Sequence, residues 1–148
     1  NYMYKRINKR KEKDINKLKD IVKDITIINN NIITLSIQGP IDSDYEHGTW
    51  QIKITIPPNY PFVSPSVGFI DKLYHPNIDL RSGSICLNTL NETWTPIYNL
   101  SHIYNIFIPQ LLLYPNPEDP LNEEAARLFK ENQIVYKENI NKYIKYFV

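Results

Sequence analysis

Apolar side chains recur at about helical spacing near the amino end of the chain. Between Met3 and Val22 they alternate with Lys, Arg, Glu and Asp, which predicts an amphipathic helix. The cations gather on the first turns, at Lys5, Arg6, Lys9, Arg10, Lys11 and Lys13. This cluster is either a solvated helix face or a docking surface. The argument for docking is that positive charge is mildly unfavourable at the positive end of the helix dipole and so needs another reason to be there.

Four β-type segments follow this helix. Two runs of β-branched residues, 24–28 and 32–38, enclose an Asn-rich turn, which is typical of a hairpin. Residues 50–56 alternate apolar and polar side chains, as in a strand with one buried face. A shorter run covers 66–70. We therefore predict an antiparallel meander after the first helix.

The strand pattern weakens between Ile70 and Leu100, and long irregular segments of compact domains are usually functional. Asn99 or Ser101 could cap a helix that runs to about residue 113, and Pro109 should kink it. Residues 122–130 and 133–146 then predict two closing helices.

Length and composition indicate one globular domain over residues 1–148. The formal charge of +1 gives no general case for nucleic-acid binding. No apolar run is long enough to span a membrane, and the charged amino end lacks the core of a signal peptide. A single cysteine cannot form an internal disulfide, so we expect a reducing compartment. We further expect a cytoplasmic or nuclear location and a monomer.

The one cysteine, Cys86, has two interpretations. A cysteine between two aliphatic residues is more often a small buried hydrophobe, but a thiolate in a loop is a strong nucleophile and its thioesters are good acyl donors. Asn77 either fixes a turn or donates to the oxyanion of acyl transfer. Asp119 is either a turn carboxylate or a group that orients a lysine and accepts its proton.

Other chemistries have less support. His75 permits a Cys–His protease hypothesis, but its spacing from Cys86 fits no local protease signature, so we expect a structural hydrogen-bonding residue. The three His residues and one Cys lack the spacing of metal ligands. The four glycines are too scattered for a phosphate-binding loop. We therefore expect neither a metal nor another cofactor.

Seven short motifs occur together in the chain. They are Gly39-Pro40, Tyr60-Pro61-Phe62, Ser64-Pro65, Tyr74-His75-Pro76-Asn77-Ile78, Gly83-Ser84-Ile85-Cys86-Leu87, Trp94-Thr95-Pro96 and Pro115-Asn116-Pro117-Glu118-Asp119-Pro120-Leu121. In order and spacing they resemble the ubiquitin-conjugating enzyme family over nearly the whole chain. Residues 94–100, 108–112 and 114–117 are most similar to the H-type branch, which serves the multisubunit CTLH/GID ligase.

The resemblance implies an α+β domain with the ubiquitin-conjugating (UBC) fold: a helix, a four-stranded meander, an active-site loop, a crossover helix and closing helices. It also implies that Cys86 takes ubiquitin as a thioester from the activating enzyme and passes it to a substrate lysine, usually with a RING-type ligase. Asn77 would be the oxyanion or loop-stabilising amide, and Asp119 the lysine-positioning carboxylate.

The resemblance further implies three contact surfaces. Phe62, Thr95, Pro96 and Ile97 would bind the ligase. Lys5, Arg6 and Lys9 would dock the activating enzyme. Ile106 and Gln110 would contact the tethered ubiquitin. Three residues depart from the family pattern. Asn88 stands where many relatives carry Asp, His47 replaces a common Gly before Gly48, and Ile97 is bulkier than usual.

Three alternatives remain open. The same chemistry could carry a ubiquitin-like modifier. A non-catalytic ubiquitin-binding scaffold would retain binding without Cys86. A cysteine hydrolase would turn over an ester without any activating enzyme.

Overall fold

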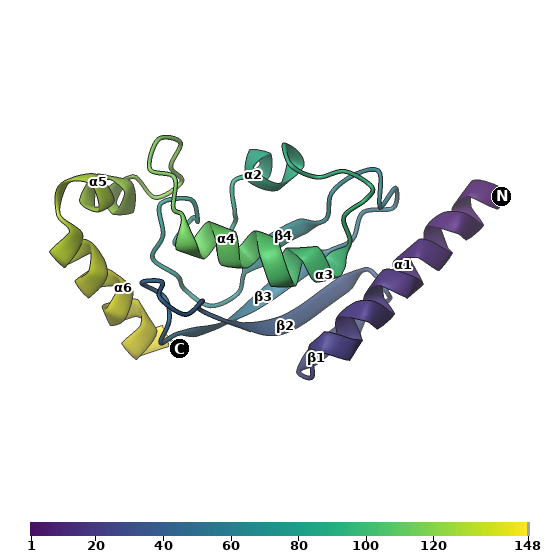
Figure 1. The fold of residues 1–148 in the computed structure, drawn as a ribbon, viewed down its shortest axis with the longest axis horizontal. Helices are drawn as coiled ribbons and strands as arrows, with labels where there is room; N and C mark the ends of the chain where they lie inside the picture. Colours follow the sequence, from purple (N-terminus) through teal and green to yellow (C-terminus); the bar gives the residue numbers. More distant parts are fainter. Residues whose placement is uncertain (148) are drawn as a thin grey trace.

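The computed structural model describes residues 1–147, with the side chains of Leu87, Asn88 and residues 145–147 left out. The elements along the chain are α1 (Tyr2–Ile21), β1 (Ile25–Ile28), β2 (Ile32–Gln38), β3 (Thr49–Thr55), β4 (Ser66–Phe69), α2 (Leu87–Asn91), α3 (Leu100–His102), the π-helical turn η1 (Ile103–Phe107), α4 (Ile108–Leu113), α5 (Glu123–Glu131) and α6 (Gln133–Phe147). Figure 1 shows the α3–η1–α4 column crossing the sheet, with α1 at one end of the molecule and α5 and α6 at the other.

The first predicted helix is confirmed as α1. The Asn1 carboxamide oxygen caps it by accepting from the Met3 backbone N–H at 2.8 Å. Ile15 and Leu18 bury its apolar face. Asp14 is the exception to the polar pattern, because only 2% of this residue is exposed.

The predicted meander is also confirmed. The strands pair antiparallel in the order β1-β2-β3-β4, and the alternate residues Ile33, Leu35 and Ile37 of β2 are buried. Asn29 and Asn30 form the first turn with positive φ angles of 52° and 56°, a region that Asn tolerates better than most residues.

The helix expected after residue 99 is present, with a change of spacing inside it. Asn99 caps it by accepting from the His102 backbone N–H at 3.2 Å. The backbone N–H of Ile108 reaches back to the carbonyl of Ile103, so the column passes through a π-helical turn immediately before Pro109. A proline cannot continue the regular α-helical hydrogen bonding, and π-turns often occur where that pattern is interrupted.

One helix was not predicted. α2 begins directly after Cys86, inside the segment that we expected to be irregular throughout. It has five residues, which is too short for an apolar period to be visible in the sequence. The expectation of a long irregular segment is therefore wrong for the residues that directly follow Cys86.

Buried tyrosines fasten the closing helices to the rest of the core. The Tyr45 hydroxyl donates to the carbonyl of Tyr74 at 2.7 Å and lies 3.0 Å from the hydroxyl of Tyr136 on α6. Tyr45 and Tyr136 are fully buried, so these contacts satisfy hydroxyl groups that would otherwise destabilise the core. None of the helices in the described part of the chain has the length and apolar character needed to cross a membrane.

We predict that Gly39→Ala lowers the free energy of unfolding by about 3 kcal/mol, because overpacking against backbone cannot relax cheaply. A Cβ at Gly39 would lie 1.7 Å from the carbonyl oxygen of Tyr45, whereas one at Gly68 would meet its nearest atom at 3.5 Å. Urea unfolding of Gly39→Ala beside Gly68→Ala checks this. Equal stability of the two variants would contradict the assigned close approach.

Candidate functional site

Cys86 lies between a short bridge and a short helix. The preceding residue, Ile85, pairs antiparallel with Ile78, and α2 follows directly. The backbone N–H of Cys86 points to the carbonyl of Asn77 at 3.4 Å. Cys86 is half-buried, unlike Ile85, which is 7% exposed. Cys86 is therefore not a fully buried hydrophobe, which favours the nucleophile.

Two clefts meet at Cys86. The first, of about 370 Å³, is lined by Asn77, Glu92, Gln110 and Asp119 among others. The second, of about 670 Å³, is lined by residues 63–67, from the loop before β4 into that strand, and reaches Leu121. The structure thus brings together the three predicted catalytic residues, Asn77, Cys86 and Asp119, in the first cleft.

The Asn77 side chain holds a neighbouring segment. Its amide nitrogen donates to the carbonyls of Asn116 at 2.7 Å and Asp119 at 3.4 Å. Its amide oxygen accepts from the backbone N–H of Asn116 at 2.8 Å. Asn77 is 4% exposed, and its donors already face backbone carbonyls. This geometry corresponds to a loop-stabilising amide, and an oxyanion role would require the amide to leave at least one of these partners.

Further backbone contacts fix the same segment. The N–H groups of Leu121 and Asn122 both donate to the carbonyl of Pro76, at 2.9 and 3.0 Å. The Asn122 side chain then caps α5 by accepting from Ala125 at 3.0 Å. Between these anchors Asp119 remains exposed, so its carboxylate stands at the wall of the cleft.

His75 connects the backbone at Asn77 to the backbone at Leu111. It is fully buried, with Nδ1 accepting from the backbone N–H of Asn77 at 2.9 Å and Nε2 lying 2.8 Å from the carbonyl of Leu111. Burial lowers the pKa of His75 from 6.5 to about 4, so the ring is neutral at physiological pH and Nε2 carries the proton that it donates to Leu111. The prediction of a structural histidine is confirmed, because both ring nitrogens are engaged.

The predicted ligase-binding residues are all exposed. Phe62 and Pro96 line a shallow hollow together with Arg6 and Arg10 of α1. Ile97 is 85% exposed and Thr95 accepts from its backbone N–H at 3.3 Å. Two loops that are distant in sequence therefore form one apolar rim against α1.

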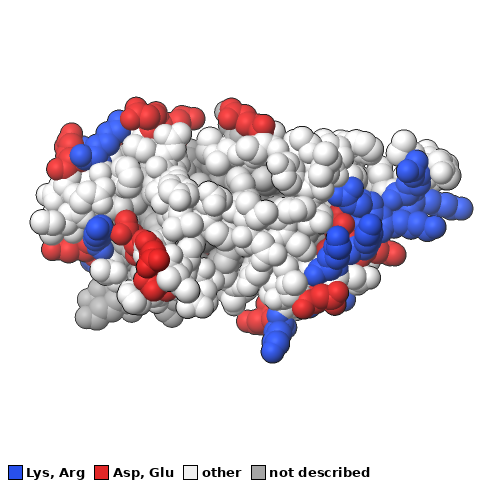
Figure 2. All heavy atoms as spheres, viewed as in Figure 1, with Lys and Arg blue, Asp and Glu red and all other residues white. Residues whose placement is uncertain are grey.

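The predicted docking cations Lys5, Arg6 and Lys9 are exposed on α1. Figure 2 shows Lys and Arg gathered over this helix, while the middle of the same face carries few charged side chains. Because Arg6 also lines the hollow beside Phe62, the two predicted surfaces adjoin.

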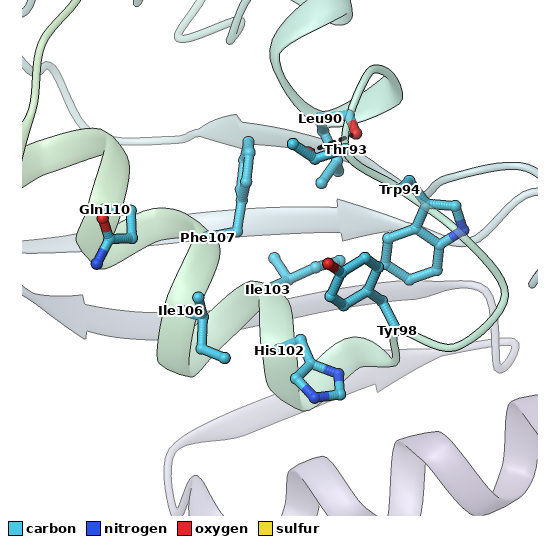
Figure 3. A pocket seen from close by; sticks show the side chains of 9 residues that line it. All are labelled: Leu90, Thr93, Trp94, Tyr98, His102, Ile103, Ile106, Phe107 and Gln110. Carbon is cyan, nitrogen blue, oxygen red and sulfur yellow. Dashed lines mark hydrogen bonds between the residues drawn. The ribbon is translucent and has the colours of Figure 1, made fainter.

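Ile106 and Gln110 line a mostly apolar cavity of about 210 Å³. Figure 3 shows them projecting from the α3–η1–α4 column, with Leu90, Thr93 and Trp94 on the opposite side. Gln110 also lines the cleft at Cys86, so this cavity and the candidate site are neighbours.

Among the described residues, the first cleft has further lining residues that were not predicted as site residues: Thr89, Glu92, Thr93, Phe107, Leu111, Tyr114 and Asn116. Glu92 follows the helix that the sequence did not reveal. Tyr114 and Asn116 belong to segment 114–117, which the sequence had already singled out for its similarity to the H-type branch. The side chain of Asn88, where the sequence departs from the family pattern, lies outside the described residues.

Comparison with known proteins gives a consistent result. The sequence profile described as ubiquitin-conjugating enzyme matches residues 3–144. The chain is 46% identical over 138 residues to ubiquitin-conjugating enzyme E2 5 of Arabidopsis thaliana, covering 92% of this chain and 75% of that protein. It is 44% identical over 138 residues to ubiquitin-conjugating enzyme E2-24 kDa of Saccharomyces cerevisiae, covering 92% of this chain and 63% of that protein.

A solved structure also matches. The E2 domain of a Toxoplasma gondii ubiquitin conjugating enzyme superposes with a TM-score of 0.84 at 28% identity, covering 95% of this chain and 98% of that one. The predicted α+β UBC fold is thereby confirmed.

The burial of His75 predicts an acid-sensitive fold. Its folded-state pKa of about 4 lies below the ordinary 6.5, so between these values the unfolded chain binds one more proton than the folded chain. The free energy of unfolding should fall by about 2 kcal/mol from pH 7.5 to pH 5. Urea unfolding at the two pH values measures this, and His75→Gln should remove most of the slope. The exposed control His47→Gln should keep it, whereas a wild-type stability that is flat over this range would contradict the assignment.

Proposed function

Because the chain belongs to the ubiquitin-conjugating enzyme family, we propose that Cys86 carries ubiquitin as a thioester and delivers it to a substrate lysine. One observation carries the assignment of residues. Asn77, Cys86 and Asp119 come from three separate segments and line one cleft. A half-buried thiol in that cleft can form a covalent intermediate.

The first step is a transthiolation. The Cys86 thiolate attacks the thioester carbonyl of ubiquitin on the activating enzyme, forms a new carbon–sulfur bond and expels the thiolate of the activating enzyme. ATP is spent beforehand, by that enzyme. The exchange of one thioester for another needs positioning more than acid–base catalysis.

The second step is an aminolysis. A neutral lysine amine attacks the carbonyl held on Cys86, and the resulting tetrahedral intermediate collapses to an amide with Cys86 thiolate as the leaving group. The attacking nitrogen must lose a proton, and the exposed Asp119 carboxylate accepts it or orients the amine. Asn77 acts by holding residues 116–119, which keeps Asp119 at the cleft.

The proposed partners follow from the outer surfaces. Lys5, Arg6 and Lys9 dock the activating enzyme, and the exposed rim around Phe62 and Ile97 binds a RING-type ligase. Ile106 and Gln110 contact the tethered ubiquitin. We also propose that residues 1–148 form one core domain and that the protein acts in the cytoplasm or the nucleus.

We further propose a CTLH/GID-type ligase as the cognate partner. The support is the similarity of residues 94–100, 108–112 and 114–117 to the H-type branch. These segments include the exposed Ile97 beside the hollow, so they could influence ligase choice.

Incubation with ubiquitin, activating enzyme and ATP tests the function. We expect a band larger by one ubiquitin that disappears with thiol reductant and does not form with Cys86→Ala. Cys86→Ser should give an adduct that resists reductant, because an oxygen ester replaces the thioester. Charging only by a ubiquitin-like modifier with its own activating enzyme would favour the alternative carrier, and no charging at all would contradict the transferase.

Asp119→Asn should slow discharge of the preformed thioester to free lysine at least about tenfold at neutral pH, because the amide cannot accept a proton. Charging by the activating enzyme should change less than about twofold, since no amine is involved. Glu118→Gln is the matched control, because Glu118 pairs with Lys130 at 3.1 Å and does not line the cleft. Equal discharge by both variants would remove Asp119 from the proposed mechanism.

A further inference from the structure

A buried carboxylate lies beneath the proposed ligase-binding rim, and the proposed chemistry does not use it. Asp14 is 2% exposed. Its Oδ2 accepts from the Tyr60 hydroxyl and, at 2.6 Å, from Nε of Arg10. Burial of a charge is costly unless it is paired and hydrogen-bonded. Arg10 and Tyr60 supply the partners that the buried Asp14 carboxylate needs.

Arg10 connects this carboxylate to a distant loop. Its Nη2 donates to the carbonyl of Tyr98 at 2.6 Å, and its guanidinium carbon lies 5.8 Å from the centre of the Tyr60 ring. A guanidinium presents its donors in a rigid planar fork, so it can hold a carboxylate and a carbonyl at once. A lysine ammonium is a compact charge without that fork.

The same contacts continue through both loops of the rim. The indole N–H of Trp94 donates to the carbonyl of Pro61 at 2.8 Å. The Trp94 ring lies 5.9 Å from that of Tyr60 and 6.0 Å from that of Tyr98, between ring centres. The loop that exposes Phe62 and the loop of residues 95–97 are therefore tied to each other and, through Arg10, to α1.

We propose that Arg10, paired with Asp14, is a positioning residue that holds these two loops in the geometry that a RING-type ligase binds. The inference rests on the proposed function. Arg10 itself lines the hollow with Phe62 and Pro96. Its guanidinium therefore fixes the Tyr98 backbone directly behind the rim. A surface that is ordered before binding loses less conformational freedom on association, and Arg10 supplies that order.

Arg10→Lys tests the proposal with the least damage to the fold. The ammonium keeps a positive charge for the buried Asp14 carboxylate but cannot bridge it to the Tyr98 carbonyl as the fork does. Arg127→Lys is the matched control, because Arg127 is exposed on α5 and faces Glu131 at 3.6 Å. The two variants make the same chemical change in two places.

The first readout is discharge of the preformed thioester to free lysine, titrated with a RING ligase selected because it accelerates the wild-type reaction. For Arg10→Lys we expect the half-maximal ligase concentration to rise five- to tenfold. The rate at saturating ligase and the rate without ligase should stay within about twofold. An equal fall of all these rates would indicate a general structural role and overturn the proposal.

The second readout needs no ligase. Hydrogen exchange of the Tyr98 amide, which donates to Thr95 at 3.0 Å, and of the Trp94 indole should accelerate at least fivefold in Arg10→Lys. Amides of β2 and β3 should exchange as in the wild type, and Arg127→Lys should change neither group. Unchanged exchange in the loop would overturn the proposal. A wild-type chain that forms no thioester would instead contradict the proposed function, while this readout still reports whether Arg10 orders the loop.

Discussion

The hydrogen-bonded contact between two chain segments beside Cys86 is the one on which the site depends. One segment carries His75 and Asn77, and the other runs from Asn116 to Asn122. The Asn77 amide makes hydrogen bonds in both directions with Asn116, and the Pro76 carbonyl accepts from two successive N–H groups. These bonds are shielded from water because Asn77 and His75 are buried, and a buried polar group that loses its partner is costly. The contact between the two segments therefore holds the residues that line the cleft in fixed positions.

These fixed positions suit a reaction whose rate depends on how the thioester and the attacking amine are positioned. The cleft offers a thiol, a carboxylate and room for an acyl chain. The nearby His75 is buried, neutral and already bonded at both ring nitrogens, so it is not available as a base. Such a site can hold an activated acyl group and accept an amine. The free energy that drives the transfer comes from the thioester formed in the preceding step. The outer loops follow the same principle, since Arg10 and Trp94 fix the backbone behind the proposed ligase rim.

Much of the fold could be predicted from the sequence because its elements have strong local signals. The alternation around Trp50 gave β3, and Asn99 marked the start of the long column. The sequence could not reveal α2, which is too short to show a period, or the burial of Asp14, which breaks the polar pattern of α1. The catalytic candidates came from motifs, but the choice between turn and oxyanion for Asn77 needed its partners. Those partners, Asn116 and Asp119, lie 39 and 42 residues away in sequence, beyond the reach of any local pattern.

The central claim is that Asn77 acts through the segment that presents Asp119. Single-turnover discharge of ubiquitin from Cys86 to free lysine, measured for Asn77→Ser, Asp119→Asn and the double variant, tests it most directly. If Asn77 acts by placing Asp119, the two losses are coupled, and the double variant is no more than about twofold slower than the slower single variant. If the two losses multiply, Asn77 contributes independently of Asp119, as a donor to the oxyanion would, and the claim is contradicted.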